Sequence, residues 1–211
     1  MAGMGDDTAL QALLAELYAA GQANDETSDD RAKKMLNLEP MTARFISTLI
    51  RLGKRRRILE IGTSNGYSTI WLAAATQPYG GQVVSLDSNP LKHTQADENL
   101  RRARLRNVVT LMTGDATLLV ADLLGPFDCV FFDADRVSAP TQLAGLLGTL
   151  SPDALLLHDN ALSHPAEIAD YLAMVDRLPD FDHTVVPSGK GLSVAYRDSG
   201  ARVLQAGTLG A

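Results

Sequence analysis

The sequence RILEIGTSNGYSTIWLAAAT, residues 57–76, joins two apolar runs through a loop that contains two glycines. The first run, 57–61, is short and rich in branched aliphatic residues, which predicts a buried strand. The second run, 66–76, is long enough for a helix. A regular alternation of strands and helices begins here, and this alternation indicates an α/β domain.

The alternation continues through most of the chain. We expect further strands at 82–87, 107–112, 128–132 and 154–157, separated by helices at 90–105, 115–124, 138–149 and 163–177. Continuous apolar strands that alternate with helices predict a parallel sheet covered on both faces. The ending differs, because 181–197 gives two strands around a Pro-Ser-Gly-Lys-Gly turn with no room for a crossover helix, so these two must pair antiparallel.

A helical segment precedes this core. Leucines at 10, 13, 14 and 17 share one helical face, with Thr8 and Gln11 as a capping box, and the polar stretch 21–30 is expected to be a loop. A second helix is expected from Pro40 to Gly53. We therefore expect one domain over 1–211, with an N-terminal helical segment at 1–53, a core at 54–197 and a flexible tail at 198–211. The leucine face needs burial, which makes a partner subunit plausible.

Composition excludes several classes of protein. The net charge of −6 does not favour nonspecific binding to nucleic acid. The single cysteine, Cys129, cannot form a disulfide within the chain, which fits a reducing cytoplasm. The first residues lack the pattern of a signal peptide, and no apolar run approaches the length of a membrane span. We therefore expect a cytoplasmic protein that binds neither nucleic acid nor membrane.

Ligands of an open parallel sheet bind beyond the carboxyl ends of its strands, so the residues after each strand are candidates. Gly62 and Gly66 follow the first strand with a spacing unlike that of dinucleotide-binding loops, and no basic residue is present there to hold phosphate. Glu60, one turn earlier, could accept from an ammonium group, which suits a cofactor with an amino-acid end. Asp87 could accept from ribose hydroxyls, and the stretch TGDA, 113–116, could flank an adenine or provide a helix cap through Asp115.

Two later strands run directly into polar side chains. FFDADR, 131–136, places Asp133 after one strand, and HDN, 158–160, places Asp159 and Asn160 after the next. Strands joined by one helical crossover are neighbours, so these oxygens can converge on one point. Two carboxylates and an amide are hard ligands suited to Mg²⁺ and leave positions for two substrate hydroxyls and a water. The alternative is that each acid caps the helix that follows it.

This combination resembles the class I S-adenosylmethionine-dependent methyltransferases, and in detail the small cation-dependent O-methyltransferases of the catechol and caffeoyl-CoA type. The resemblance covers about residues 32–197. It rests on LEIGTSNGYSTIWLA, on FFDADR followed by DN 26 residues after Asp133, and on GKGLSVAYR. It implies a Rossmann-like methyltransferase fold whose mostly parallel seven-stranded sheet carries an antiparallel C-terminal hairpin.

The resemblance also implies ligands and an activity. The expected reaction is methylation of a hydroxyl on a small catechol-like acceptor, a vicinal diol, by S-adenosylmethionine, with Mg²⁺ (or Mn²⁺ or Ca²⁺) in a homodimer. The cofactor would contact Glu60, Gly62, Thr63, Ser64, Gly66, Tyr67, Ser68, Asp87, Ser88, Gly114, Asp115, Ala116 and Asp133. The metal would be held by Asp133, Asp159 and Asn160.

One residue departs from the family pattern. Arg136 stands where the family usually has a lysine that is read as the general base, and arginine cannot lose its proton at working pH. Arg136 would then act by charge or bind a substrate carboxylate, and His158 is an alternative base. Two other functions stay open. The arginine clusters at 54–57 and 101–106 are expected to be solvated, but they also suggest an RNA methyltransferase. Arg136 suggests a protein that binds the cofactor without turnover.

Overall fold

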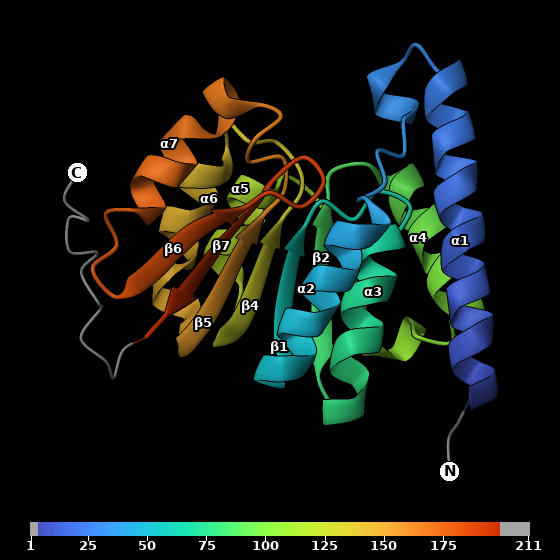
Figure 1. Cartoon of the computed structure of the whole chain (residues 1–211), viewed down its shortest axis with the longest axis horizontal. Helices are drawn as coiled ribbons and strands as arrows, with labels where there is room; N and C mark the ends of the chain where they lie inside the picture. The colour runs from blue at the N-terminus through green and yellow to red at the C-terminus, as the bar shows by residue number, and fades with distance from the viewer. Residues whose placement is uncertain (1–3, 199–211) are drawn as a thin grey trace.

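A seven-stranded sheet forms the centre of the structure (Figure 1). The computed structural model describes residues 4–198, so nearly all of the tail predicted at 198–211 lies outside the described residues. The strands are β1 (Arg57–Ile61), β2 (Gln82–Asp87), β3 (Val109–Thr113), β4 (Phe127–Phe132), β5 (Leu150–His158), β6 (Phe181–Val186) and β7 (Leu192–Arg197). Their order is β3-β2-β1-β4-β5-β7-β6, and only the pairs that involve β7 are antiparallel. The predicted mostly parallel sheet with an antiparallel hairpin is confirmed.

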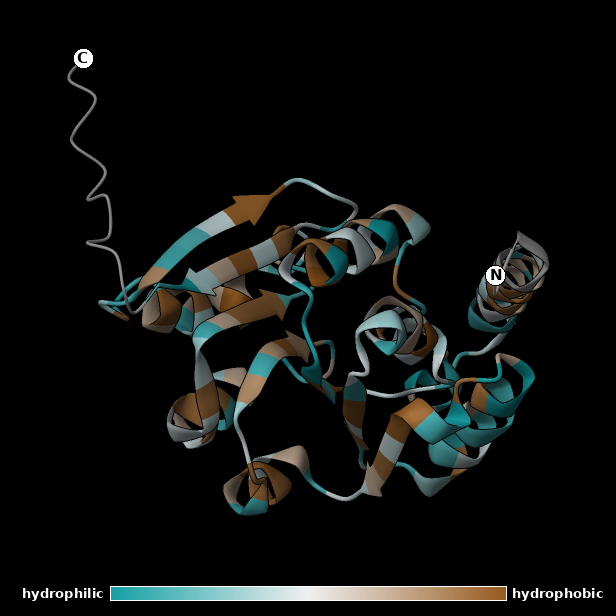
Figure 2. Ribbon diagram, turned by 90° about the horizontal axis from the view of Figure 1, so that it is seen from below, coloured by the Kyte–Doolittle hydropathy of each residue, from teal (hydrophilic) through white to brown (hydrophobic). Residues whose placement is uncertain are grey.

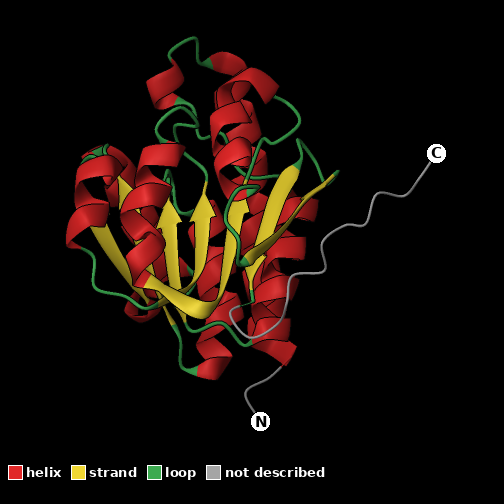
Figure 3. Cartoon of the chain, turned by 90° about the vertical axis from the view of Figure 1, so that its left-hand side faces the viewer, coloured by secondary structure: helices red, strands yellow, loops and turns green. Residues whose placement is uncertain are grey.

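Helices cover both faces of the sheet (Figures 1 and 3). The α-helices are α1 (Met4–Thr27), α2 (Pro40–Gly53), α3 (Tyr67–Thr76), α4 (Pro90–Arg102), α5 (Ala116–Leu119), α6 (Ala139–Leu146) and α7 (Pro165–Val175). Short 3₁₀ turns occur at η1 (Arg31–Lys33), η2 (Gln77–Tyr79), η3 (Arg106–Val108), η4 (Val120–Asp122) and η5 (Leu147–Thr149). Helices α2 to α4 pack on one face with α1 outside α3, and α5 to α7 pack on the other. No helix of the described residues is both long and apolar enough to cross a membrane.

The apolar strands feed two separate cores because successive strand residues face opposite sides of the sheet. Ile58 and Phe131 belong to the core beneath α1 to α4, whereas Leu59 and Val130 belong to the core beneath α5 to α7. Figure 2 shows the hydrophobic residues concentrated along the strands. This alternation also decides which way each polar residue near a strand end points, and it therefore positions the site.

Several predicted boundaries are wrong. Helix α1 extends to Thr27, so most of the loop predicted at 21–30 is helical, and the proposed capping box of Thr8 and Gln11 lies inside a helix that begins at Met4. The end of α1 is fixed by tertiary contacts, since the carboxylate of Asp25 accepts hydrogen bonds from two later backbone N–H groups.

Three further elements differ from their predicted extents. The helix expected at 115–124 is four residues of α5 followed by a 3₁₀ turn, and β3 begins at Val109 because 106–108 form another 3₁₀ turn. Strand β5 begins at Leu150, four residues earlier than predicted, and its pairing with β4 is interrupted by a shift in register between Phe127 and Cys129. Local sequence does not report such extensions, because pairing with a neighbour creates them.

The leucine face of α1 is satisfied within the chain. Leu13, Leu14 and Leu17 are buried in the core beneath α3, so they give no reason to expect a partner subunit. The basic cluster at 54–57 is also less exposed than predicted. Arg55 is buried and donates to the carbonyl and the carboxylate of Asp153 at 2.5 and 2.7 Å.

We expect Tyr171→Phe to stabilise the protein. The Tyr171 ring is fully buried on α7, and its hydroxyl has no hydrogen-bond partner within residues 4–198. Removal of an unpaired buried hydroxyl should raise the free energy of unfolding by about 1 kcal/mol. Denaturant unfolding measures the change, and Tyr196→Phe, at a half-exposed position, is the matched control. A loss of stability in the Tyr171 variant would reveal a partner for the hydroxyl.

Candidate functional site

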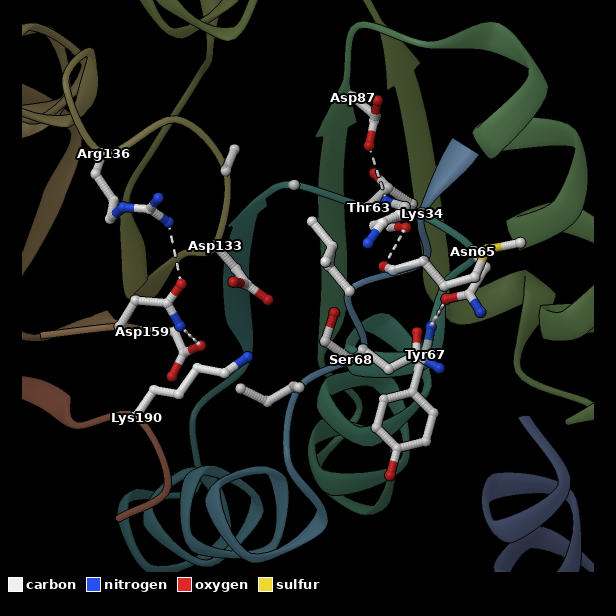
Figure 4. Close-up of a pocket in the computed structure, with 18 of the residues that line it drawn as sticks. Lys34, Thr63, Asn65, Tyr67, Ser68, Asp87, Asp133, Arg136, Asp159 and Lys190 are labelled. Carbon is white, nitrogen blue, oxygen red and sulfur yellow. Dashed lines mark hydrogen bonds between the residues drawn. The ribbon is translucent and has the colours of Figure 1, made fainter. Parts of the chain in front are cut away.

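A cavity of about 220 Å³ opens where the carboxyl ends of β1, β4 and β5 meet (Figure 4). A second cavity of about 340 Å³ adjoins it beyond β2 and β3. The predicted site residues that line the first are Gly62, Thr63, Ser64, Tyr67, Ser68, Asp87, Asp133, Arg136, Asp159 and Asn160. Those that line the second are Gly62, Asp87, Ser88, Gly114, Asp115 and Ala116. Glu60, Gly66 and His158 were also predicted, but they line neither cavity.

The loop after β1 depends on Gly62 for a close approach of two backbone segments. Gly62 has a φ of +112°, and a Cβ atom there would lie 2.3 Å from the carbonyl oxygen of Asp133. Only glycine fits this crossing. Gly66, in contrast, begins α3 with a φ of +84° and lies against Ala96 of α4, so it serves helix packing rather than the cavity wall.

Glu60 lies under the glycine loop and does not face the cavity. Its carboxylate accepts hydrogen bonds from Ser68, Thr69 and Ser85, each at 2.5 Å. Full burial raises the pKa of Glu60 to about 7, although the three hydroxyls oppose the shift. The expectation that Glu60 meets a cofactor ammonium therefore needs correction, because strand alternation turns its side chain toward α3.

Asp87 reaches both cavities from the end of β2. Its carboxylate accepts from the backbone N–H of Ser64 and of Asn89, both at 2.8 Å, which ties the glycine loop to the start of α4. Asn89 caps α4, and Asp115 caps α5 as its capping alternative predicted. Asp87 is thus fixed in place, and each oxygen keeps a further lone pair for a ligand hydroxyl.

Asp133 and Asp159 lie side by side because β4 and β5 pair in parallel, with Phe132 opposite His158. Burial, and then the charge of Asp159, raises the pKa of Asp133 well above its usual range. Burial likewise raises the pKa of Asp159 to about 6. Neither acid caps the following helix, since Ser138 precedes α6 and His164 precedes α7. The capping alternative for these two acids is therefore wrong.

The chemistry of these donors fits a hard divalent cation. Oδ1 of Asp159 is buried without a hydrogen-bond partner among the described residues, and Asn160 donates from Nδ2 to the other oxygen of Asp159. Asn160 adopts a left-handed φ of +66°, which brings its side chain back toward this acid. No group of three or more His, Cys, Asp or Glu side chains in 4–198 is arranged to hold a metal. A third protein ligand beside the two acids would have to be of another type, and the amide oxygen of Asn160 is of a suitable kind.

Arg136 is held beside this acid pair by two contacts (Figure 4). Its Nε donates to Oε2 of Glu167 at 2.8 Å, and Nη1 donates to Oδ1 of Asn160 at 3.0 Å. The residue is only 8% exposed, so the guanidinium is a fixed positive charge at the cavity wall.

His158 faces the opposite side of the sheet from the cavity. The ring stacks on Phe132 and meets Tyr171 edge-on, with its Nδ1 hydrogen-bonded to the carbonyl oxygen of Asp159 at 2.7 Å. Burial lowers the pKa of His158 to about 4. The structure therefore argues against the suggested role of His158 as a base, for the reason that strand alternation gives.

Sequence reasoning missed two contributors to the cavity. Lys190, between two glycines in the β6–β7 turn, extends toward the acid pair and lies 3.5 Å from Glu39 (Figure 4). The segment 28–39, between α1 and α2, covers the cavity with Lys34, Met35 and Leu36. The lysine within Gly-Lys-Gly was a detectable signal, whereas the covering segment carries no motif.

Known proteins share these features. A family model described as a methyltransferase domain matches residues 59–161. A catechol O-methyltransferase of Mycobacterium tuberculosis is 34% identical over 160 residues, which cover 75% of this chain and 67% of that protein. One of Niastella koreensis is 34% identical over 131 residues, or 60% of this chain and 59% of that protein. The chain thus spans about three fifths to two thirds of the length of these curated relatives.

Solved structures agree with the sequence comparison. An O-methyltransferase from Bacillus cereus, crystallised with S-adenosylhomocysteine, superposes with a TM-score of 0.74 at 25% identity, covering 89% of this chain and 91% of that one. The likeness therefore extends over most of both chains.

We expect Glu60→Gln to remove a pH-dependent loss of stability. The carboxyl of Glu60 has a pKa near 4.5 when unfolded and about 7 when folded, so it ionises first in the unfolded chain. The stabilisation that the protonated Glu60 carboxyl gives to the folded state is fully present below pH 4.5, and it is lost as the pH rises through 7. The stability of wild type relative to Glu60→Gln should fall by up to about 3 kcal/mol across this range. Urea unfolding at several pH values measures it, and a pH-independent difference would refute the pKa shift.

Proposed function

The chain belongs to the class I S-adenosylmethionine-dependent O-methyltransferase family of the catechol and caffeoyl-CoA type, and from this premise we propose that it methylates a hydroxyl of a small vicinal-diol acceptor with the help of a divalent cation. The observation that carries the proposal is the position of Asp133. This acid lies at once beside the glycine loop and beside Asp159 and Asn160. A methyl donor and a metal-bound acceptor would therefore meet at one residue.

The residues around the glycine loop would hold S-adenosylmethionine, which supplies the methyl group. Ser68 and Tyr67, at the start of α3, would face the amino-acid end, and Asp87 would accept from the ribose hydroxyls. The wall of the second cavity, from Gly114 to Ala116, would flank the adenine. The protein's main contribution would be to align donor and acceptor in a reactive geometry.

Asp133, Asp159 and Asn160 would hold Mg²⁺ or a similar hard cation, which would acidify and orient the acceptor hydroxyl. Two buried carboxylates that lie near each other are unfavourable unless a cation compensates their charge. The unpaired oxygen of Asp159 supports this assignment. Arg136 would stabilise the developing acceptor oxyanion by charge, because it cannot accept the proton.

The two alternative functions have less support. Arg101 and Arg106 both pair with Asp97, and Arg102 pairs with Glu16, so these arginines are engaged within the chain rather than presented to RNA. Binding without turnover stays distinguishable by experiment, since it requires a cofactor complex but no methylated product. A homodimer and a cytoplasmic location are kept as part of the proposal on the basis of the family resemblance and the composition.

We expect methyl transfer to a catechol to require magnesium or manganese. Chelation with EDTA should abolish turnover while calorimetry still detects S-adenosylhomocysteine binding. Asp159→Asn keeps the shape of the side chain but removes its charge, and it should lower kcat by about 100-fold or more. Asp182→Asn, at an exposed carboxylate of β6, is the matched control. Full activity in excess EDTA would exclude the metal role.

We expect Arg136 to contribute charge rather than proton transfer. Arg136→Lys should keep or raise activity, because lysine retains the charge and can also lose a proton. Arg136→Met should weaken stabilisation of the oxyanion by about 1–3 kcal/mol. Steady-state kinetics as a function of pH measure both variants. Equal rates for wild type and the methionine variant would show that the guanidinium has no part in the reaction.

A further inference from the structure

The segment 28–39, here called the covering segment, joins α1 to α2 (Figure 1). It passes over the cavity in which the cofactor would bind. Lys34, Met35 and Leu36 line this cavity from above. The segment contains one 3₁₀ turn and otherwise has no regular structure of its own. Contacts with neighbouring elements must therefore fix its position.

Lys92 of α4 makes the central contact. Its side chain is buried, with 8% of the residue exposed, and no proposed catalytic or binding step uses it. The ammonium donates to the carbonyl oxygen of Lys34 at 2.7 Å and to that of Lys33 at 3.4 Å, and it lies 3.2 Å from Sδ of Met35. All three contacts belong to the covering segment. A buried ammonium placed in this way is a charge-assisted clamp on backbone carbonyls.

Two further contacts hold the same stretch of backbone. Ser64 of the glycine loop donates from its hydroxyl to the carbonyl oxygen of Met35 at 2.8 Å. Asp25 of α1 accepts from the N–H groups of Met35 and Leu36 at 2.6 and 2.8 Å. Leu36 has a left-handed φ of +49°, a conformation that costs free energy for a leucine and that these hydrogen bonds maintain.

The ammonium of Lys92 also interacts electrostatically with Asp87, the acid that is proposed to bind the ribose. The charges of Asp87 and Asp25 attract the ammonium of Lys92, and Asp87 also accepts from the backbone N–H of Ser64. Lys92 therefore connects α4, the helix that follows Asp87, to the covering segment.

We propose that Lys92 is a positioning residue that locks the covering segment over the cofactor cavity, so that S-adenosylmethionine enters and S-adenosylhomocysteine leaves only when this lock opens. The second half of this inference rests on the proposed function. The lock itself does not, since it concerns contacts within the chain alone.

Lys92→Met tests the lock, because methionine has a similar length but neither the charge nor the N–H donors. Lys33→Met is the matched control. It changes a lysine of the covering segment whose side chain is 76% exposed and whose ammonium lies 3.5 Å from Asp30. Hydrogen–deuterium exchange of the free protein, measured at the amides of residues 33–38, reports the closed state without any ligand.

In Lys92→Met, we expect these amides to exchange about tenfold faster or more, as for loss of a charge-assisted hydrogen bond, while amides of β1 and β4 stay protected. Lys33→Met should exchange like wild type. Unchanged exchange at residues 33–38 in Lys92→Met would overturn the lock. Lys92→Arg, which keeps the charge and donors, should restore at least part of the protection.

The coupling to ligand exchange is tested with S-adenosylhomocysteine by surface plasmon resonance. Its dissociation rate should rise about tenfold in Lys92→Met, with KM for S-adenosylmethionine rising while kcat is kept or increased. Faster amide exchange with an unchanged dissociation rate would overturn the coupling and leave the lock. Failure of wild type to bind S-adenosylhomocysteine would instead refute the proposed function, and the exchange measurement would still decide the lock.

A second variant tests the covering segment independently, in case Lys92→Met does not fold. Asp25→Asn leaves the Lys92 side chain in place but weakens the hydrogen bonds that Asp25 accepts, and it should accelerate exchange at Met35 and Leu36 in the same way. Protection equal to wild type in this variant would show that the covering segment does not depend on these contacts.

Discussion

The buried carboxylate of Glu60 holds together the elements from which the cavity is built. It accepts from Ser68 and Thr69 at the start of α3 and from Ser85 on β2, so one side chain ties β1 to its neighbouring strand and to the following helix. Thr63 of the glycine loop continues this network through Ser85 at 2.6 Å. A fully satisfied polar network in a dry interior fixes its members more narrowly than apolar packing does. The loop between Glu60 and Ser68 is thereby held at both ends.

The carboxyl edge of the sheet concentrates negative charge in a place that burial makes costly. Asp133 and Asp159 are adjacent, and burial, followed by the charges of Asp159 and Glu60, raises the pKa of Asp133. Arg136 and Lys190 lie at the wall of the same cavity and partly offset this charge. Such an arrangement costs stability and is typical of functional sites.

The covering segment is held in position in a different way from the glycine loop. Leu38 anchors its end in the hydrophobic core, whereas Lys92, Ser64 and Asp25 attach residues 33–36 through their backbone groups. Hydrogen bonds to the backbone can break and reform without disturbing the core. A part of the cavity wall can therefore open while the sheet beneath it stays intact.

The sequence by itself determined the sheet and the chemistry at its edge. Apolar strands that alternate with helices specify a covered parallel sheet, and Gly62, Asp87, Asp133 and Asp159 were identified because the residues that follow such strands must meet at one edge. Only the tertiary structure decided where individual side chains point. Glu60 and His158 turned away from the cavity, because their place in the strand alternation fixes their direction while their residue type suggested a role. Lys92 and the extension of α1 to Thr27 were beyond sequence reasoning, because each depends on contacts between segments far apart in the chain.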